Sequence, residues 1–196
     1  NSPPPTTNYK LVTTNFPLLA LLISGGHTEL VIAKKIGSYK ILGETRDDAV
    51  GEAFDKVARM LGLPYPGGPQ ISKLAEEARQ SGHRMPRYWL PRPMIHSNNL
   101  DFSFAGLKTA VLYTLKKLPT FQLGGRTSKY PQLGSRVPKW EIFKQEIARE
   151  FEDAVTEVLV AKARRAILNT NPKILILGGG VSANKHIRRE FEKMVK

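Results

Sequence analysis

The sequence contains no cysteine, which excludes a disulfide framework and a thiolate metal site. It also lacks long hydrophobic runs: the longest, residues 16–23, has the length of a strand, whereas a membrane-spanning helix needs roughly 20 apolar residues. The beginning of the chain, residues 1–15, is polar and rich in proline, and it has no features of a signal peptide. We therefore expect a cytoplasmic protein that does not bind a membrane, with residues 1–15 as a tail or loop.

Several motifs that identify a known chemistry are also missing. There is no G-x-x-x-x-G-K-[ST] phosphate loop and no G-x-G-x-x-G fingerprint, so a P-loop nucleoside triphosphatase is excluded. There is no H-E-x-x-H zinc helix and no G-x-S-x-G serine nucleophile. The histidines lack metal-ligand spacing, which favours turn, loop or surface positions for His27, His83, His96 and His186.

Acidic residues are few relative to basic ones. The chain has 17 Asp and Glu against 30 Lys and Arg, a formal net charge of +13. Such an excess indicates a polyanionic partner, nucleic acid before a membrane surface, although a generally basic composition can also serve solubility. With 196 residues, 41% hydrophobic and 8% aromatic, the chain is long and apolar enough for one well-buried domain.

Residues 18–33 predict a β-hairpin, because two apolar runs of strand length flank a turn that contains Gly25 and Gly26. Neither glycine has a Cβ, so a ligand can approach the backbone N–H groups closely. Ser24 and Thr28 add hydroxyls, and this combination suits an anion such as a phosphate. The alternative is an ordinary hairpin with a flexible turn. Residues 39–43 predict a third strand.

Periodic apolar residues predict helices over residues 45–61, 71–80, 104–118 and 140–168. Thr45, with Asp48 completing a capping box, is the expected N-cap of the first, and Ser103 that of the third. Residues 63–69 (LPYPGGP) predict a stiff loop, and residues 119–139 a long loop without periodicity.

The first predicted helix carries an acidic face. Asp48, Glu52 and Asp55 lie at i, i+4 and i+7, so their carboxylates share one side of the helix. A functional acidic surface is one interpretation. Ordinary ion pairs of Glu52 with Lys56 and of Asp55 with Arg59 are the other.

Near the end of the chain, a predicted strand over residues 173–177 runs into three glycines, and a helix begins near residue 183. Strand, glycine loop and helix N-terminus form a geometry that holds nucleotides, because the helix end presents unpaired N–H groups.

Basic residues interleaved with aromatics mark two further segments. Such pairs can neutralise phosphates and stack on bases, but they are also common in plain surface loops. The candidate contacts to nucleic-acid phosphates are Arg84, Arg87 and Arg92 beside Tyr88 and Trp89, and Arg126, Lys129 and Arg136 beside Tyr130.

Taken together, the motifs resemble one family, the tRNA N6-adenosine threonylcarbamoyltransferases (TsaD in bacteria). The resemblance covers the chain from about Phe16 to its end, and the matching segments keep the family order. They are residues 22–28 (LISGGHT), 47–56 (DDAVGEAFDK), 65–69 (YPGGP), 99–110 (NLDFSFAGLKTA) and 178–184 (GGGVSAN).

The resemblance implies an α/β fold of the actin-like ATPase type (ASKHA, ribonuclease H-like), with a mixed sheet and helices on both faces. Residues 16–196 would be the second of two lobes, truncated at both ends relative to the family. The implied activity transfers the threonylcarbamoyl group from threonylcarbamoyl-AMP to N6 of adenosine 37, in tRNAs that read codons starting with A. The hairpin turn would contact the phosphate end of that substrate, Asp55 and Gly68 its nucleoside, and Asn184 the adenine. The implied substrate-binding set is Leu22, Ile23, Ser24, Gly25, Gly26, Asp55, Gly68 and Asn184.

The family also implies a divalent metal, iron or zinc-like, and as partners tRNA, a TsaB-type paralogue and a TsaE-type ATPase. The family's His-x-x-x-His metal pair does not occur in this chain, and no Asp follows Asp153. Ser72 stands where some relatives have an acidic residue. We therefore expect no metal ligands in this chain and no activity of the chain in isolation. A non-catalytic scaffold paralogue, or another phosphotransferase with the actin-like fold, remains as the alternative.

Overall fold

A computed structural model gives the structure of the protein and describes residues 15–81, 88–117 and 139–196. Three strands open the fold, β1 (Leu18–Ile23), β2 (Thr28–Lys35) and β3 (Ser38–Glu44). The helices α1 (Val50–Met60), α2 (Gly67–Gln80), α3 (Ala105–Lys116) and α4 (Lys139–Thr170) follow. The strand β4 (Ile174–Gly178), the short 3-10 helix η1 (Gly180–Ala183) and α5 (Lys185–Val195) complete it. The predicted loop over residues 119–139 lies almost wholly outside the described residues.

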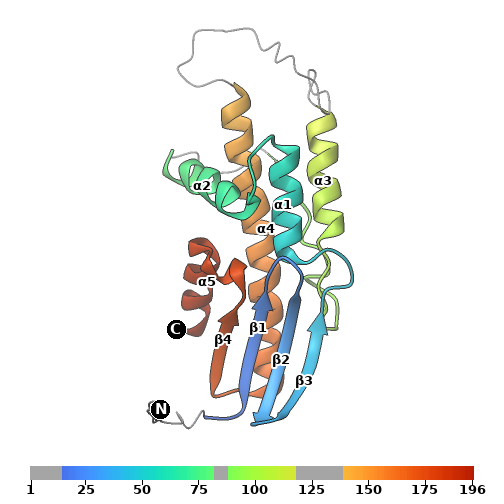
Figure 1. Ribbon diagram of the computed structural model, residues 1–196, viewed down its shortest axis with the longest axis vertical. Coiled ribbons are helices and arrows are strands. Elements are labelled where there is room, and N and C mark those ends of the chain that lie inside the picture. Colours follow the sequence, from blue (N-terminus) through green and yellow to red (C-terminus); the bar gives the residue numbers. More distant parts are fainter. Residues whose placement is uncertain (1–14, 82–87, 118–138) are drawn as a thin grey trace, which may run out of the picture.

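The strands form one mixed sheet in the order β3-β2-β1-β4. β1 pairs with β2 antiparallel, with Leu21 opposite Leu30, which confirms the predicted hairpin. β1 pairs with β4 parallel, with Leu21 opposite Leu177. The parallel pairing brings the hairpin turn and the glycine-rich end of β4 to the same edge of the sheet, although they are far apart in the sequence (Figure 1).

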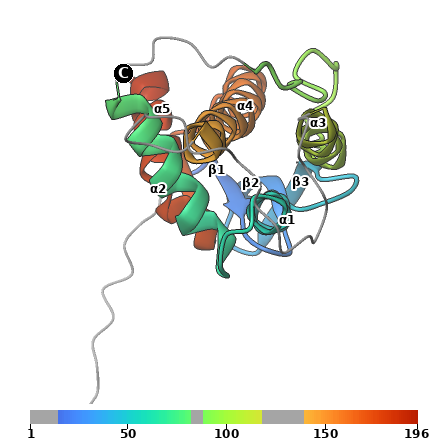
Figure 2. The same cartoon turned by 90° about the horizontal axis from the view of Figure 1, so that it is seen from above.

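One face of this sheet carries the core. Leu19 and Leu21 point to that face and are fully buried, and α4 packs on β1 and β2. Phe191 of α5 belongs to the same core, so α4 and α5 lie on the same side of the sheet (Figure 2). Leu22, on the opposite face, is 38% exposed, and Ile176 of β4 is 42% exposed. The mixed α/β fold is thus confirmed, but in the described part of the chain the helices cover one face of the sheet and not both.

Two helices, α1 and α2, begin several residues away from their predicted first residues. α1 begins at Val50 and not at Thr45, because residues 45–48 are held by contacts with other parts of the fold. Thr45 forms a β-bridge with Phe102, and the carboxylate of Asp47 accepts hydrogen bonds from the backbone N–H groups of Phe104 (2.8 Å) and Ala105 (3.2 Å). Asp47 therefore supplies the cap of α3 that we had predicted for Ser103.

α2 begins at Gly67 and not at residue 71, so the predicted Pro-Gly-Gly loop forms the first turn of a helix. Proline is compatible with a first turn, because the N–H that it lacks has no partner within the helix there. Pro69 therefore does not interrupt α2.

A segment without regular structure, residues 88–104, is tied to α4 by buried polar contacts. Lys162 is fully buried, and its ammonium donates to the Ser97 hydroxyl (2.7 Å) and to the carbonyl oxygen of Asn99 (2.8 Å). Arg165 donates to the carbonyl oxygen of Ile95 at 3.1 Å. These bonds replace water around backbone groups that would otherwise be buried without partners.

Candidate functional site

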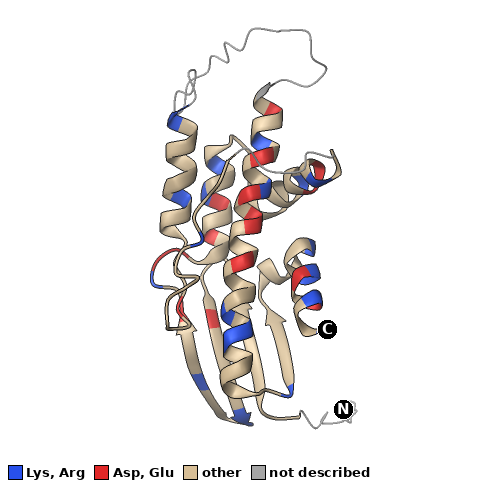
Figure 3. Ribbon diagram, turned by 180° about the vertical axis from the view of Figure 1, so that it is seen from behind, with Lys and Arg blue, Asp and Glu red and all other residues tan. Residues whose placement is uncertain are grey.

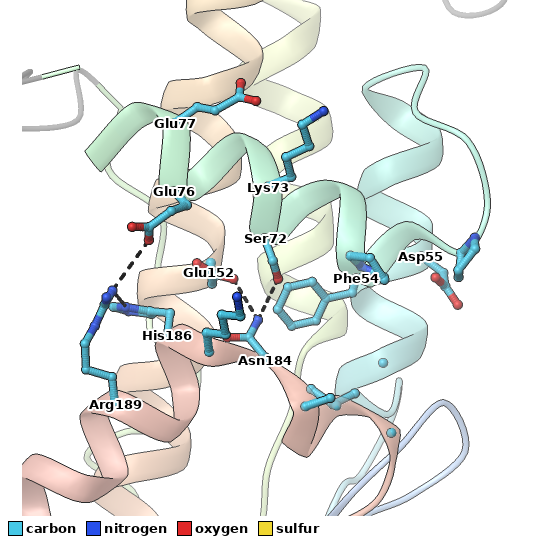
Figure 4. Close-up of a pocket in the computed structure, with 18 of the residues that line it drawn as sticks. Phe54, Asp55, Ser72, Lys73, Glu76, Glu77, Glu152, Asn184, His186 and Arg189 are labelled. Atoms are coloured by element: carbon cyan, nitrogen blue, oxygen red, sulfur yellow. Dashed lines mark hydrogen bonds and ion pairs between the residues drawn. The ribbon is translucent and has the colours of Figure 1, made fainter. Parts of the chain in front are cut away.

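A pocket of about 930 Å³ opens between α1, α2, the hairpin turn and the η1–α5 segment. Four segments line it, through Gly25 of the turn, Asp55 of α1, Gly68 of α2 and Asn184 before α5. Figure 4 shows Asp55 and Asn184 among the lining side chains. Phe54, with its ring at the wall, and Val181 supply apolar surface. The pocket therefore combines apolar surface with many polar and charged side chains of α2 and of the η1–α5 segment.

The hairpin turn is fixed to the beginning of α1. The backbone N–H of Gly51 donates to the carbonyl oxygen of Ser24 at 3.0 Å, and that of Val50 donates to the buried hydroxyl of Thr28 at 2.9 Å. A Cβ on Gly51 would lie 2.7 Å from the Ser24 carbonyl oxygen, closer than real Cβ contacts come. Only glycine at position 51 lets α1 approach the turn this closely, and the pocket depends on that approach.

Within the turn, the hydroxyl of Ser24 accepts hydrogen bonds from the N–H groups of Gly26 (3.2 Å) and His27 (2.9 Å). The N–H of Gly26, one of the two that the sequence offered to an anion, is therefore bonded inside the turn. Gly25 is the turn residue that lines the pocket.

Asp55 links α1 to α2. Its Oδ1 accepts a hydrogen bond from the N–H of Gly67 at 2.8 Å. A Cβ on Gly67 would lie 2.5 Å from the Cβ of Ala58, so glycine is needed where the helices meet. In the described residues Asp55 forms no ion pair with Arg59, whereas the predicted pair of Glu52 and Lys56 is present at 2.7 Å.

Asp48, the third acid of the predicted face, is mostly buried and contacts the ammonium groups of Lys56 (2.6 Å) and Lys108 (3.0 Å). Burial by itself would raise the pKa of Asp48, but the hydrogen bonds from Lys56 and Lys108 outweigh it and lower the pKa. Asp48 therefore joins α1 to α3 and does not line the pocket.

Asn184 also lines the pocket and is the N-cap of α5. Its Oδ1 accepts a hydrogen bond from the N–H of Ile187 at 2.9 Å. Its amide donates to the hydroxyl of Ser72 (2.8 Å) and to the carboxylate of Glu152 (2.7 Å), as Figure 4 shows.

Behind Asn184, a charged network joins α2, α4 and α5. Arg79 of α2 contacts Glu152 (2.6 Å) and Asp153 (2.5 Å) of α4, and Asp153 also accepts from His186 of α5 at 3.0 Å. Burial would raise the pKa of Asp153, but the hydrogen bonds from His186 and Arg79 outweigh it, so its pKa is lowered. Figure 3 shows how acidic residues gather along the middle of α4.

The sequence interpretation missed Glu152, although a signal was present. Glu152 shares a helix face with Ala148, Val155 and Leu159, at i−4, i+3 and i+7, and all three are fully buried. An acid on an otherwise apolar face must be paired when the helix packs.

Comparison with known proteins identifies the family of the chain. The profile described as "TsaD: tRNA N6-adenosine threonylcarbamoyltransferase" matches residues 6–196. The chain belongs to this family. Relatives that carry the same name in Chromobacterium violaceum, Burkholderia mallei and Neisseria gonorrhoeae are 48%, 49% and 46% identical over 88%, 88% and 92% of the chain. The matched stretches are 45%, 45% and 46% of those relatives, so the chain spans about half the length of the curated relatives it matches.

The substrate-binding residues implied by the TsaD resemblance divide into two groups. Gly25, Asp55, Gly68 and Asn184 line the pocket together. The others do not line it: Ile23 is buried in the core, Leu22 lies on the open face of the sheet, and Ser24 and Gly26 are hydrogen-bonded to each other within the turn.

The basic residues proposed for tRNA are only partly described, because Arg84, Arg87, Arg126, Lys129 and Arg136 lie outside the described residues. Arg92 is described, and the structure argues against a phosphate contact for it. Its guanidinium bonds both carboxylate oxygens of Glu157 (2.8 Å each) and also contacts Glu150. The hydrogen bonds that Arg92 donates to Glu157 and Glu150 outweigh burial and raise the pKa of Arg92.

Among residues 15–81, 88–117 and 139–196, no group of three or more His, Cys, Asp or Glu side chains could hold a metal ion. In the same part of the TsaD chain, no helix combines the length and the apolar character that crossing a bilayer requires.

Proposed function

We propose that this pocket binds the nucleoside part of threonylcarbamoyl-AMP, and that the protein transfers the threonylcarbamoyl group to N6 of adenosine 37 in tRNAs that read codons starting with A. In that reaction the N6 amine attacks the carbamoyl carbon, the bond from this carbon to the phosphate oxygen breaks, AMP leaves and the amine loses a proton. The observation that carries the proposal is the meeting of Gly25, Asp55, Gly68 and Asn184 at one pocket in a chain of the TsaD family.

Each part of the pocket suits a part of this ligand. The volume of about 930 Å³ admits a nucleotide, and Phe54 and Val181 offer apolar surface to a planar base. Asp55 uses Oδ1 for Gly67, and its second oxygen can accept from a ribose hydroxyl. Gly25, at the other end, brings backbone and no side chain to the phosphate.

The proposal includes the family's partners and cofactor at the level of the whole protein. tRNA is the acceptor, a TsaB-type paralogue and a TsaE-type ATPase are the protein partners, and the protein acts in the cytoplasm. The divalent metal, iron or zinc-like, would take its ligands from outside the described residues. No observation favours the scaffold or phosphotransferase alternatives.

The test separates the two roles of Asp55. Asp55→Asn in the full-length enzyme keeps an oxygen for the Gly67 N–H but replaces the second oxygen by a donor. We expect the binding free energy of threonylcarbamoyl-AMP to weaken by about 1.5–3 kcal/mol, the range for hydrogen bonds to charged groups. The melting temperature of the variant should equal that of the wild type. Titration calorimetry and thermal unfolding measure both. Unchanged affinity would contradict the assignment of the ribose to Asp55.

A further inference from the structure

The side chain of Asn184 has almost no hydrogen-bonding capacity left for a ligand. An asparagine amide has two N–H donors and one oxygen with two lone pairs. Both donors are used, on Ser72 (2.8 Å) and on Glu152 (2.7 Å), and one lone pair accepts from the Ile187 N–H (2.9 Å). What remains for the pocket is the second lone pair of Oδ1, an acceptor.

Glu152 decides which way this amide points. Its side chain is 1% exposed, one carboxylate oxygen accepts from Asn184, and the other accepts from Arg79 at 2.6 Å. A carboxylate can only accept, so it holds the nitrogen of the Asn184 amide and excludes the flipped arrangement. A buried carboxylate without these partners would be costly, so the arrangement has little freedom to change.

Ser72 adds the complementary group. Its hydroxyl oxygen already accepts from Asn184, which leaves the hydroxyl hydrogen to donate, and Ser72 lines the pocket. The pair therefore presents one acceptor, Oδ1 of Asn184, and one donor, the hydroxyl of Ser72. The six-membered ring of adenine offers a donor at N6 beside an acceptor at N1, whereas hypoxanthine reverses both.

We propose that Glu152 is a positioning residue of the nucleotide pocket: by fixing the Asn184 amide, it sets the acceptor and donor that distinguish adenine from a 6-oxopurine. The proposal rests on the proposed function, since it assumes that a nucleobase occupies the pocket beside Asn184. Glu152 itself touches no ligand in this account, because both its oxygens are bonded to protein groups.

The test measures the affinities of AMP and inosine monophosphate for the full-length enzyme. In Glu152→Gln, the donor-only guanidinium of Arg79 takes the new amide oxygen, so an N–H₂ group faces the N–H₂ of Asn184. We expect AMP affinity to fall about tenfold, the equivalent of one hydrogen bond, and the preference for AMP over inosine monophosphate to shrink by the same factor. Adding Asn184→Asp restores a donor–acceptor pair with residue 152 and keeps the acceptor for Ile187, although the Ser72 hydroxyl then donates to the new carboxylate. AMP affinity should therefore recover in part and exceed that of Asn184→Asp alone. Asn184→Asp alone places two carboxylates together and should lose both AMP affinity and preference.

The matched control is Glu150→Gln. Glu150 lies on the same helix, is 3% exposed, and bonds the Leu90 N–H and Arg92, but it does not line the pocket. Glu150→Gln should leave the ratio of the AMP and inosine monophosphate affinities unchanged. If removing any buried charge of α4 lowered the AMP preference, Glu150→Gln would lower it as much as Glu152→Gln.

The outcomes separate the two claims. An unchanged AMP preference in Glu152→Gln, or a double variant no better than Asn184→Asp, would overturn the positioning role while leaving nucleotide binding intact. The comparison of the double variant with Asn184→Asp tests the positioning role even if Glu152→Gln does not fold. Failure of the wild-type enzyme to bind either nucleotide would overturn the proposed function, and the positioning role with it.

Discussion

Gly51 offers a sharp test of how the pocket is built. It is the second residue of α1, and a Cβ there would lie 2.7 Å from the Ser24 carbonyl oxygen and 2.9 Å from the Cα of Gly25. Ordinary contacts begin near 3.4 Å, so in Gly51→Ala either the turn or the helix must move by several tenths of an ångström. The movement also weakens the 3.0 Å bond from the Gly51 N–H to Ser24.

The expected change in the unfolding free energy of Gly51→Ala is the sum of opposing effects. Overpacking costs about 1–3 kcal/mol, loss of the hydrogen bond adds about 0.5–1.5 kcal/mol, and alanine returns about 1 kcal/mol of helix propensity. The net expectation is a loss of about 1–3 kcal/mol in the free energy of unfolding. Because the turn itself moves, nucleotide affinity should fall as well.

The control is Gly106→Ala. Gly106 is likewise the second residue of its helix, α3, but a Cβ there meets no atom within 4 Å. This variant should be neutral or more stable by up to about 1 kcal/mol. Urea unfolding followed by circular dichroism compares both variants with the wild type. If Gly51→Ala proves as stable as Gly106→Ala, the close approach of α1 to the turn is wrong.

Two further predictions concern charged groups. Burial, with the nearby charge of Arg165, lowers the pKa of Lys162 from 10.5 to about 8, so between these values the unfolded chain binds more protons and stability rises with pH. Lys162→Met should remove that rise, measured as the difference in unfolding free energy between pH 8 and 10.5; an identical pH dependence in both proteins would refute it. For tRNA, Arg92→Ala should lower stability and leave the salt dependence of binding unchanged. Arg84→Ala with Arg87→Ala should flatten the log–log slope by about 1.4 if both residues touch phosphate, and an unchanged slope would remove them from the interface.

Local patterns in the sequence predicted most of the fold. The hairpin follows from two apolar runs on either side of a turn with two glycines, and α4 follows from apolar residues at helical spacing. The beginnings of α1 and α2 did not follow, because distant groups determine them. Asp47 was expected in the first turn of α1, but its carboxylate instead caps α3 by accepting a hydrogen bond from the N–H of Phe104.

Some residues of the site could likewise be located from the sequence, and others could not. Motifs located Gly25, Asp55, Gly68 and Asn184, and the parallel pairing of β1 with β4 brings the segments of Gly25 and Asn184 to one edge of the sheet. Glu152 depends on partners in other elements, so its position on α4 indicated burial but not the identity of those partners. For Arg92 the sequence predicted a contact with phosphate, because basic and aromatic residues alternate around it. The structure instead pairs Arg92 with Glu150 and Glu157 of α4, which are distant in the sequence.

Gly68 allows the most direct test of nucleotide binding in this pocket. It lines the pocket in the first turn of α2, and a Cβ added to it meets no atom within 4 Å, so a larger side chain fits the fold but occupies space at the pocket. The measurement is the affinity of full-length Gly68→Leu for AMP by titration calorimetry, with its melting temperature as the control for folding. If the nucleoside binds where we propose, affinity falls by at least about tenfold, since overpacking costs more than about 1 kcal/mol, while the melting temperature stays that of the wild type. Wild-type affinity in this variant would show that the nucleotide binds elsewhere.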